Sequence, residues 1–478
     1  MMQINNDEKN VFATYRKHLD TLLNGNPLTE ALEVILKKED VLSRLHRPHP
    51  TADNFQELPN FYKKTQLNHF RRVISPHPYS FFLYQKCMEL ILCGYIDRNP
   101  LSATNIKLRT TIGENAQNGI YEENLNLTIG MTSAPSNVIT GISGASKTTT
   151  ARSILSLIPQ VIPHKEFEGQ PFMHRQLTYI SFDCAATKSP KALALSFFAA
   201  VDKVLGTQYF QQWERRSKDS VERFYANMQL VATKHHIGLI HIDEVQFFLK
   251  YIGSSTSPNL AVIESLFNKI GIPVILSCTL EGLDLFEPVP SNDSSKLPDM
   301  TTVRRMLDDR EFKFGNYTFN SPEFQKIYDE FFPEAICVGG LPSDEFKLRF
   351  HWLSAGIPAI INRLARLHHE QIIITNKQTT DDIETLNSVY KSQFRHIDFA
   401  LEQIRNSNPD EKPTQHQLTK YEDNLPRRAN GDADWGNTKG AEETKTLIAP
   451  KVPGIPEYGN SSDSSKSTKS DDDFESGV

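Results

Sequence analysis

The sequence predicts an α/β protein in which a parallel sheet is covered by helices on both faces and followed by a helical lid. Short apolar runs at 137–140, 177–183, 239–242 and 272–279 have the character of buried strands. They alternate with segments, such as 149–158, that carry apolar residues at helical spacing. The part after about 340 has helical patterns only. Alternating strands and helices predict a parallel sheet, and helices alone predict the lid.

We expect four parts along the chain. Residues 1–125 form a mostly helical N-terminal region, 126–340 the α/β core, 341–405 the helical lid and 406–478 a disordered tail. After about 405 the composition is dominated by Asn, Pro, Lys, Asp, Ser and Gly. Such a tail cannot bury enough apolar surface to fold alone.

Composition restricts the function classes. At 478 residues the chain is long enough for two or three domains, and its net charge of -6 means that any nucleic-acid contact must be local. No apolar run is long enough to span a membrane, and the first residues lack signal-peptide character. We therefore expect a cytoplasmic protein without a membrane partner. The 5 cysteines form no CxxC pair, which favours reduced core residues over a disulfide framework or a zinc site.

The loop at 141–148 predicts phosphate binding. Its glycines allow a tight turn whose N–H groups point at the phosphates, and the start of the next helix adds partial positive charge. Lys147 is expected to reach the β- and γ-phosphates of ATP, and Thr148 to hold Mg²⁺. The residues expected to bind the nucleotide are Gly141, Ile142, Ser143, Gly144, Ala145, Ser146, Lys147, Thr148 and Thr149.

Ser146 departs from the phosphate-loop pattern, which has a glycine at that place. A side chain there narrows the available backbone angles, and Gly144 can supply some of the lost freedom. For this stretch taken alone, the alternative is a Ser/Thr-rich helix N-cap that binds no ligand.

Two acids, Asp243 and Glu244, follow directly on the apolar run 239–242. Asp243 is expected to accept the Mg²⁺ water shell, and Glu244 to polarise a water for attack on the γ-phosphate. The alternative is an ordinary solvated strand end. The strand-like run 177–183 lies between the two motifs in the chain. An extra strand between the phosphate loop and the acidic strand, with a glutamate beside the aspartate, is typical of the ATPases that include the AAA+ proteins. The expected fold is therefore an AAA+ P-loop NTPase.

Three further positions are candidate catalytic residues. Thr279, at the end of the run 272–279, is expected to sense the γ-phosphate, with Ser277 as the second choice. The alternative is a buried polar strand end satisfied by backbone groups. Arg304 and Arg305 are expected to reach a neighbouring subunit's nucleotide as an arginine finger, and ordinary surface arginines are the alternative.

The segment 354–366 is similar to the start of a lid helix that carries a second sensor. The arginine usually found within about one turn of the glycine is absent at that spacing, so Arg363 is the candidate.

The middle of the chain, about 94–286, resembles the TnsC family of ATP-dependent transposition regulators and, more distantly, TniB and IstB. Several of the matching segments have no part in ATP binding in general, which makes the resemblance more specific than a pair of nucleotide motifs. The matching segments are 94–100, 141–148, 159–162 with His164, 182–184, 197–198 with 202–206, 238–246 and 271–275.

The resemblance implies a function. Members of this family are AAA+ ATPases that assemble on double-stranded target DNA as ATP-bound rings or helical filaments. They connect a target-selector protein, either a site-specific DNA-binding protein or an RNA-guided complex, to the transposase subunits, and hydrolysis removes them from unsuitable DNA. The resemblance also implies that Lys147 and Thr148 bind ATP and Mg²⁺, that Asp243 positions the metal and that Glu244 activates water. Arg304 and Arg305 align with an arginine pair in similar proteins.

The sequence offers only scattered basic residues as candidates for contact with DNA. A filament needs few phosphate contacts per subunit, because many subunits add up. A solvated face is the alternative for each of the candidates, which are Lys188, Lys191, Arg215, Arg216 and Lys218. Other functions also stay open: a signalling ATPase of AAA+ or STAND-like type, a helicase loader, and a nucleotide-binding scaffold that no longer hydrolyses ATP.

Overall fold

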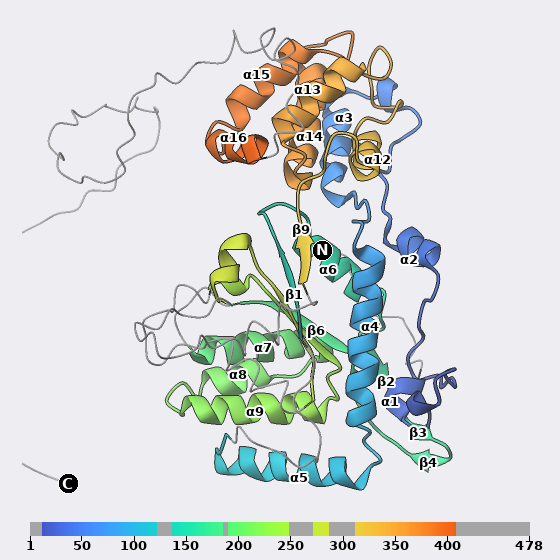
Figure 1. The fold of residues 1–478 in the computed structure, drawn as a ribbon, viewed down its shortest axis with the longest axis vertical. Helices are drawn as coiled ribbons and strands as arrows, with labels where there is room; N and C mark the ends of the chain where they lie inside the picture. Colours follow the sequence, from blue (N-terminus) through green and yellow to red (C-terminus); the bar gives the residue numbers. More distant parts are fainter. Residues whose placement is uncertain (1–11, 122–135, 185–189, 248–270, 286–310, 408–478) are drawn as a thin grey trace, which may run out of the picture. The chain divides into compact units, whose positions relative to one another are not determined.

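The computed structural model describes residues 12–121, 136–184, 190–247, 271–285 and 311–407 (Figure 1). The chain divides into two units, Met1–Lys412 and Pro413–Val478. The second unit lies wholly outside the described ranges. The tail predicted from 406 lies outside them from 408 onward.

A five-stranded sheet forms the centre of the core, with the strand order β6-β7-β8-β1-β9. Every pair of neighbouring strands is parallel, so the carboxyl ends of the strands meet at one edge. The strand between β1 and β7 is β8, whereas the run expected at 177–183 gives β6 on the other side of β7. The strands are β1 Ser136–Gly141, β6 Tyr179–Asp183, β7 Leu239–Asp243, β8 Val274–Ser277 and β9 Glu311–Phe314. The predicted α/β fold is confirmed.

Helices cover both faces of this sheet because alternate strand residues point to opposite sides. Ile180, Ile240 and Val274 pack under α5, α7, α8 and α9, whereas Leu239 and Ile275 pack under α4 and α6 (Figure 1). The first group comprises α5 Ala103–Asn118, α7 Pro190–Leu205, α8 Tyr209–Glu214 and α9 Val221–Lys234. The second comprises α4 Ser80–Asp97 and α6 Lys147–Leu155, joined by α1 Pro27–Glu30 and α2 Lys38–Leu45.

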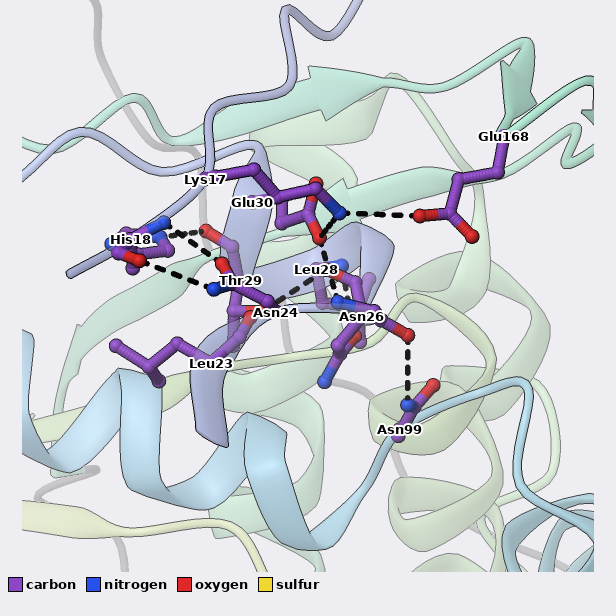
Figure 2. A network of polar contacts seen from close by, with 11 residues as sticks. Lys17, His18, Leu23, Asn24, Asn26, Leu28, Thr29, Glu30, Asn99 and Glu168 are labelled. Carbon is purple, nitrogen blue, oxygen red and sulfur yellow. Dashed lines mark hydrogen bonds and ion pairs between the residues drawn. The ribbon is translucent and has the colours of Figure 1, made fainter. Parts of the chain in front are cut away.

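A polar network fastens the start of the N-terminal region to the core (Figure 2). The buried carboxylate of Glu30 accepts a hydrogen bond of 2.7 Å from Lys17 Nζ, which also lies 3.2 Å from Glu168 Oε1. Asn26 caps α1 and donates from Nδ2 to the carbonyl oxygen of Tyr95 at 2.7 Å. Two small antiparallel pairs flank this network: β3 Glu166–Phe167 with β4 Gln170–Pro171, and β2 Val161–Pro163 with β5 Arg175–Leu177.

The lid is a helical bundle with its own hydrophobic core. This core also contains Phe55, Leu67 and Phe70 of the N-terminal region, and α3 packs against α14 (Figure 1). The N-terminal region thus packs on both the sheet and the lid. The bundle includes α12, which precedes the lid boundary predicted at 341. Its helices are α12 Pro322–Phe331, α13 Asp344–Ser354, α14 Pro358–Ile374, α15 Ile383–Gln393 and α16 Asp398–Ser407, contacted by α3 Asn60–Leu67 and the short helix η3 Asn68–Arg72. The remaining short helices are η1 Thr21–Leu23, η2 Phe55–Glu57 and η6 Leu280–Leu285.

Candidate nucleotide-hydrolysis site

The phosphate loop runs from the end of β1 to the start of α6. Gly141 has a φ of 148°, and a Cβ there would lie 2.0 Å from the carbonyl oxygen of Phe314 in β9, so this position requires glycine. Lys147 Nζ donates to the carbonyl oxygens of Gly141 and Ile142, both at 2.9 Å. Burial lowers the pKa of Lys147. The lysine ammonium is therefore folded over the loop whose backbone would hold the phosphates.

Ser146 itself adopts the left-handed conformation, with φ 68° and ψ 15°. Gly144 is also left-handed, with φ 84°, so it does not relieve the serine of this requirement. A non-glycine residue in this region costs about 1 to 2 kcal/mol. The Ser146 side chain makes no capping hydrogen bond, which argues against a loop that serves only as a helix N-cap.

The two acids lie at the carboxyl end of β7, next to the loop. Asp243 is only 2% exposed, which does not fit a solvated strand end. Its Oδ1 accepts a 2.9 Å hydrogen bond from the amide of Glu244. Among the described residues its Oδ2 has no hydrogen-bond partner, although Arg152 Nη2 lies 3.7 Å away. Glu244 has a φ of 58°, and this turn separates its half-buried carboxylate from the buried strand.

These oxygens suit a magnesium ion. A buried carboxylate oxygen that lacks a hydrogen-bond partner and a half-buried threonine hydroxyl are both oxygen ligands of the kind that Mg²⁺ prefers. Asp243 and Thr148 are therefore the residues that would hold the ion. When bound, Mg²⁺ would neutralise charge on the β- and γ-phosphates.

The structure distinguishes the two candidate sensors on β8. Ser277 Oγ lies 2.8 Å from His241 Nε2, and His241 Nδ1 lies 2.8 Å from Ser181 Oγ. Burial lowers the pKa of His241 to about 4, so the ring is neutral and bonds both hydroxyls across three strands. Thr279 Oγ1 is buried and has no partner among the described residues, and Thr279 lines the cleft. Thr279, the first choice, therefore lies at the site, whereas Ser277, the second choice, forms a hydrogen bond within the sheet.

Gln246 is a site residue that sequence reasoning did not assign. Its Nε2 donates to Glu244 Oε2, and its Oε1 accepts a 3.3 Å hydrogen bond from the amide of Thr279. One side chain thus links the expected general base to the expected sensor. The only signal in the sequence is its place two residues after Glu244, which does not reveal a contact to β8.

A cleft of about 1470 Å³ opens above the loop, larger than the roughly 300 to 1,000 Å³ of most small-molecule sites. Lys147, Thr148, Glu244 and Thr279 line its floor. The lid contributes a wall that includes Tyr317, Ile327, Phe331, Pro358, Ala359 and Asn362. The N-terminal region contributes Arg47, Arg71, Arg72, Val73 and Ile74 among others. The cleft has the volume to hold a nucleoside triphosphate whose phosphates would lie on the loop.

A comparison with known protein families agrees with this geometry. Residues 131–286 match the protein family described as "AAA domain". The chain contains an AAA domain and is an ATPase. The match gives the AAA domain and does not distinguish the TnsC family from other AAA proteins. No curated protein matches the chain.

Solved structures resemble the chain only distantly. The Walker-type ATPase PABY2304 of Pyrococcus abyssi has 12% identity and a TM-score of 0.34 over 63% of this chain and 75% of that chain. The RuvB Holliday junction branch migration motor of Thermotoga maritima has 11% identity and a TM-score of 0.29 over 60% and 68%. A katanin structure has 16% identity and a TM-score of 0.26 over 60% and 77%.

The lid helix next to the AAA domain carries no arginine in the cleft. Arg363 is exposed, donates from Nη2 to the carbonyl oxygen of Gln393 at 3.2 Å and lies 4.8 Å from the ring centroid of Phe394. It does not line the cleft. Ala359 lies in the first turn of α14 instead, and its amide donates to the carbonyl oxygen of Gly144 at 3.1 Å.

Some predicted positions are not tested by the structure. Arg304, Arg305 and Lys188 lie outside the described residues. Within the described ranges, no helix combines the length and apolar character needed to cross a membrane.

Proposed function

We propose that this ATPase is a regulator of DNA transposition. In this proposal it assembles with ATP and Mg²⁺ on double-stranded target DNA, as a ring or helical filament of identical subunits. It then links a target-selector protein to the transposase subunits. Glu244 activates the attacking water, Arg304 and Arg305 reach the nucleotide of a neighbouring subunit, and hydrolysis drives disassembly.

The observation that carries the proposal is that three TnsC-like segments, 94–100, 238–246 and 271–275, meet through residues that have no role in ATP chemistry. In the segment 94–100, Arg98 Nη1 donates to the carbonyl oxygen of Ile237 at 2.7 Å. A Cβ on Gly238 would lie 2.6 Å from the hydroxyl oxygen of Tyr95, and a Cβ on Gly271 would lie 3.1 Å from Arg98 Cδ. The three segments therefore depend on one another, which favours a shared inheritance over separate chance matches.

An exposed basic turn at the end of α8 is the best DNA contact among the described candidates. Arg215, Arg216 and Lys218 are all exposed. Lys191 has a different role, because its Nζ donates to the carbonyl oxygen of Ser217 at 2.6 Å and so supports the turn. We propose that the three exposed cations contact DNA phosphates, while Lys191 holds their backbone in place.

Electron microscopy of the protein with duplex DNA and a slowly hydrolysed ATP analogue tests this function. Rings or filaments that surround the duplex are expected with the analogue and not without nucleotide. Lys147→Ala should abolish them, and the double variant R215E/K218E should weaken duplex binding while the exposed control Arg44→Glu on α2 leaves it intact. Equal duplex binding with and without nucleotide at moderate salt would refute the proposal. Assemblies that ignore DNA would instead favour a signalling ATPase.

A further inference from the structure

Three arginines from outside the AAA domain line the nucleotide cleft. Arg47, Arg71 and Arg72 belong to two segments, 47–50 and 71–75, which together we call the arginine strap. The strap precedes by many residues the part of the chain that matches the AAA domain, 131–286. It nevertheless borders the same cleft as Lys147 and Thr148.

Backbone contacts hold the strap in place. Arg47 and Ile74 exchange two backbone hydrogen bonds of 3.0 Å, which form an antiparallel bridge between the two segments. Just before the second segment, the carbonyl oxygen of Phe70 accepts a 2.7 Å hydrogen bond from Asn362 Nδ2 in the cleft wall. The Phe70 ring is buried in the lid core, 5.2 Å from the ring of Phe331. The strap arginines therefore project from a backbone fixed to the lid.

The charges of the strap are not neutralised within the described part of the chain. Arg47, Arg71 and Arg72 are exposed, and no described carboxylate forms an ion pair with them. By contrast, the nearby Arg366 pairs with Glu370 at 3.3 Å. The described acids that line the cleft are Glu244 and Glu281, against these three arginines and Lys147. A cleft of this charge favours a multiply charged anion, and guanidinium groups bind phosphate oxygens through paired hydrogen bonds.

Among the described residues, the lid supplies no cation to the part of the cleft next to the phosphate loop. Its wall next to the phosphate loop consists of Pro358, Ala359 and Asn362, which carry no charge, and Arg363 is turned toward α15. A larger side chain at 359 has little room, because even a Cβ added to Gly144 would lie 3.0 Å from Ala359 Cβ. We propose that Arg47, Arg71 and Arg72 bind the nucleotide phosphates within the same subunit and supply the cation that the lid helix lacks. The proposal rests on ATP binding by the AAA domain and not on a role in transposition.

Nucleotide binding to the isolated protein, without DNA, tests the proposal. The probe is a fluorescent ATP analogue, competed with ATP, ADP and adenosine. The triple variant R47Q/R71Q/R72Q should bind ATP at least about 10-fold more weakly, a change of roughly 1.4 kcal/mol. ADP should lose affinity as well, and adenosine, which has no phosphate, should not. The exposed arginines Arg44 and Arg363 do not line the cleft, so Arg44→Gln and Arg363→Gln should bind ATP like the unmodified protein.

The three single Arg→Gln variants keep the test valid if the triple variant unfolds, because each changes one exposed side chain, and at least one should weaken ATP binding. Unchanged ATP affinity in all of them would overturn the proposal. An equal loss for adenosine would also overturn it, since the arginines would then shape the base site. Unchanged ATP affinity with weakened duplex binding would assign them to DNA phosphates instead. Failure of the unmodified protein to assemble on DNA would refute the proposed function and leave this result unaffected.

Discussion

The amide of Ala359 donates a 3.1 Å hydrogen bond to the carbonyl oxygen of Gly144, so the first turn of the lid helix α14 rests directly on the phosphate loop. The side chains of the lid also lie close to Gly144, because a Cβ added to this glycine would lie 3.0 Å from Ala359 Cβ and 3.2 Å from Ile357 Cγ2. The position of the lid and the conformation of the phosphate loop are therefore coupled through contacts of Gly144 with Ala359 and Ile357.

Gly144→Ala should break this coupling. The substitution adds strain at a φ of 84° and pushes a methyl group against Ala359, so we expect a loss of about 2 to 3 kcal/mol in the free energy of unfolding and weaker ATP binding. Gly169→Ala is the matched control, because Gly169 has a φ of 77° but nothing within 4 Å. It should show the backbone strain alone. Equal losses in the two variants, measured by denaturant unfolding, would mean that the lid contact contributes nothing.

Ser146→Gly should relieve strain in the phosphate loop. Glycine tolerates the φ of 68° without the penalty of a side chain, and its greater freedom in the unfolded chain offsets part of the gain. We expect an increase of up to about 1 kcal/mol in the free energy of unfolding, and ATP affinity equal to or higher than that of the unmodified protein. Ser146→Ala, which keeps the strain, should show neither gain. Weaker ATP binding by the glycine variant would instead assign the serine hydroxyl to nucleotide contact.

Thr279→Val should impair catalysis without harming the fold. The hydroxyl it removes is buried and has no partner among the described residues, so stability should stay the same or rise slightly. If this group senses the γ-phosphate, kcat should fall on the order of 100-fold. Ser277→Ala should do the reverse, with near-normal kcat and a loss of about 1 to 3 kcal/mol, because it leaves His241 without one of its partners. The opposite pattern in paired turnover and unfolding measurements would make Ser277 the sensor.

His77 should make the fold sensitive to mild acid. Its ring stacks on Phe314 with centroids 4.0 Å apart, and burial lowers its pKa from 6.5 to about 4. Between these values the unfolded chain binds a proton that the folded protein does not, so the free energy of unfolding falls as the pH drops through this window. His77→Asn can still accept the Tyr79 amide and does not titrate. Its unfolding free energy should decline by about 2 kcal/mol less between pH 7 and pH 5. Identical slopes for the two proteins would contradict this expectation.

The central motifs could be predicted because each depends on a short stretch of sequence. The apolar run before Asp243 predicts a buried strand, and the glycines before Lys147 predict a tight loop. Two acids and a phosphate loop at carboxyl ends of parallel strands then have to meet at one edge of the sheet. Thr279 could be placed ahead of Ser277 from the sequence because it ends the strand run, whereas the hydrogen bond between Ser277 and His241 is visible only in the structure.

The parts that escaped prediction depend on contacts between distant segments. The strand between β1 and β7 follows both of them in the sequence, so chain order misplaces it. Nothing near Arg47 or Arg72 in sequence indicates that the N-terminal region crosses to the nucleotide cleft, because the bridge to Ile74 and the contact to Asn362 join segments far apart. The sequence likewise does not reveal that the side chain of Gln246 forms hydrogen bonds to both Glu244 and Thr279.

The most direct test of the ATPase site is phosphate release by the unmodified protein and by Glu244→Gln, measured with their ATP affinities. The substitution keeps the size of the side chain and removes the carboxylate that would activate water. We expect steady turnover by the unmodified protein, a loss of at least about 100-fold in the variant and ATP affinities within a factor of about three of each other. Equal phosphate release by the two proteins, or none by either in the presence of Mg²⁺ and duplex DNA, would contradict the assignment of hydrolysis to this site.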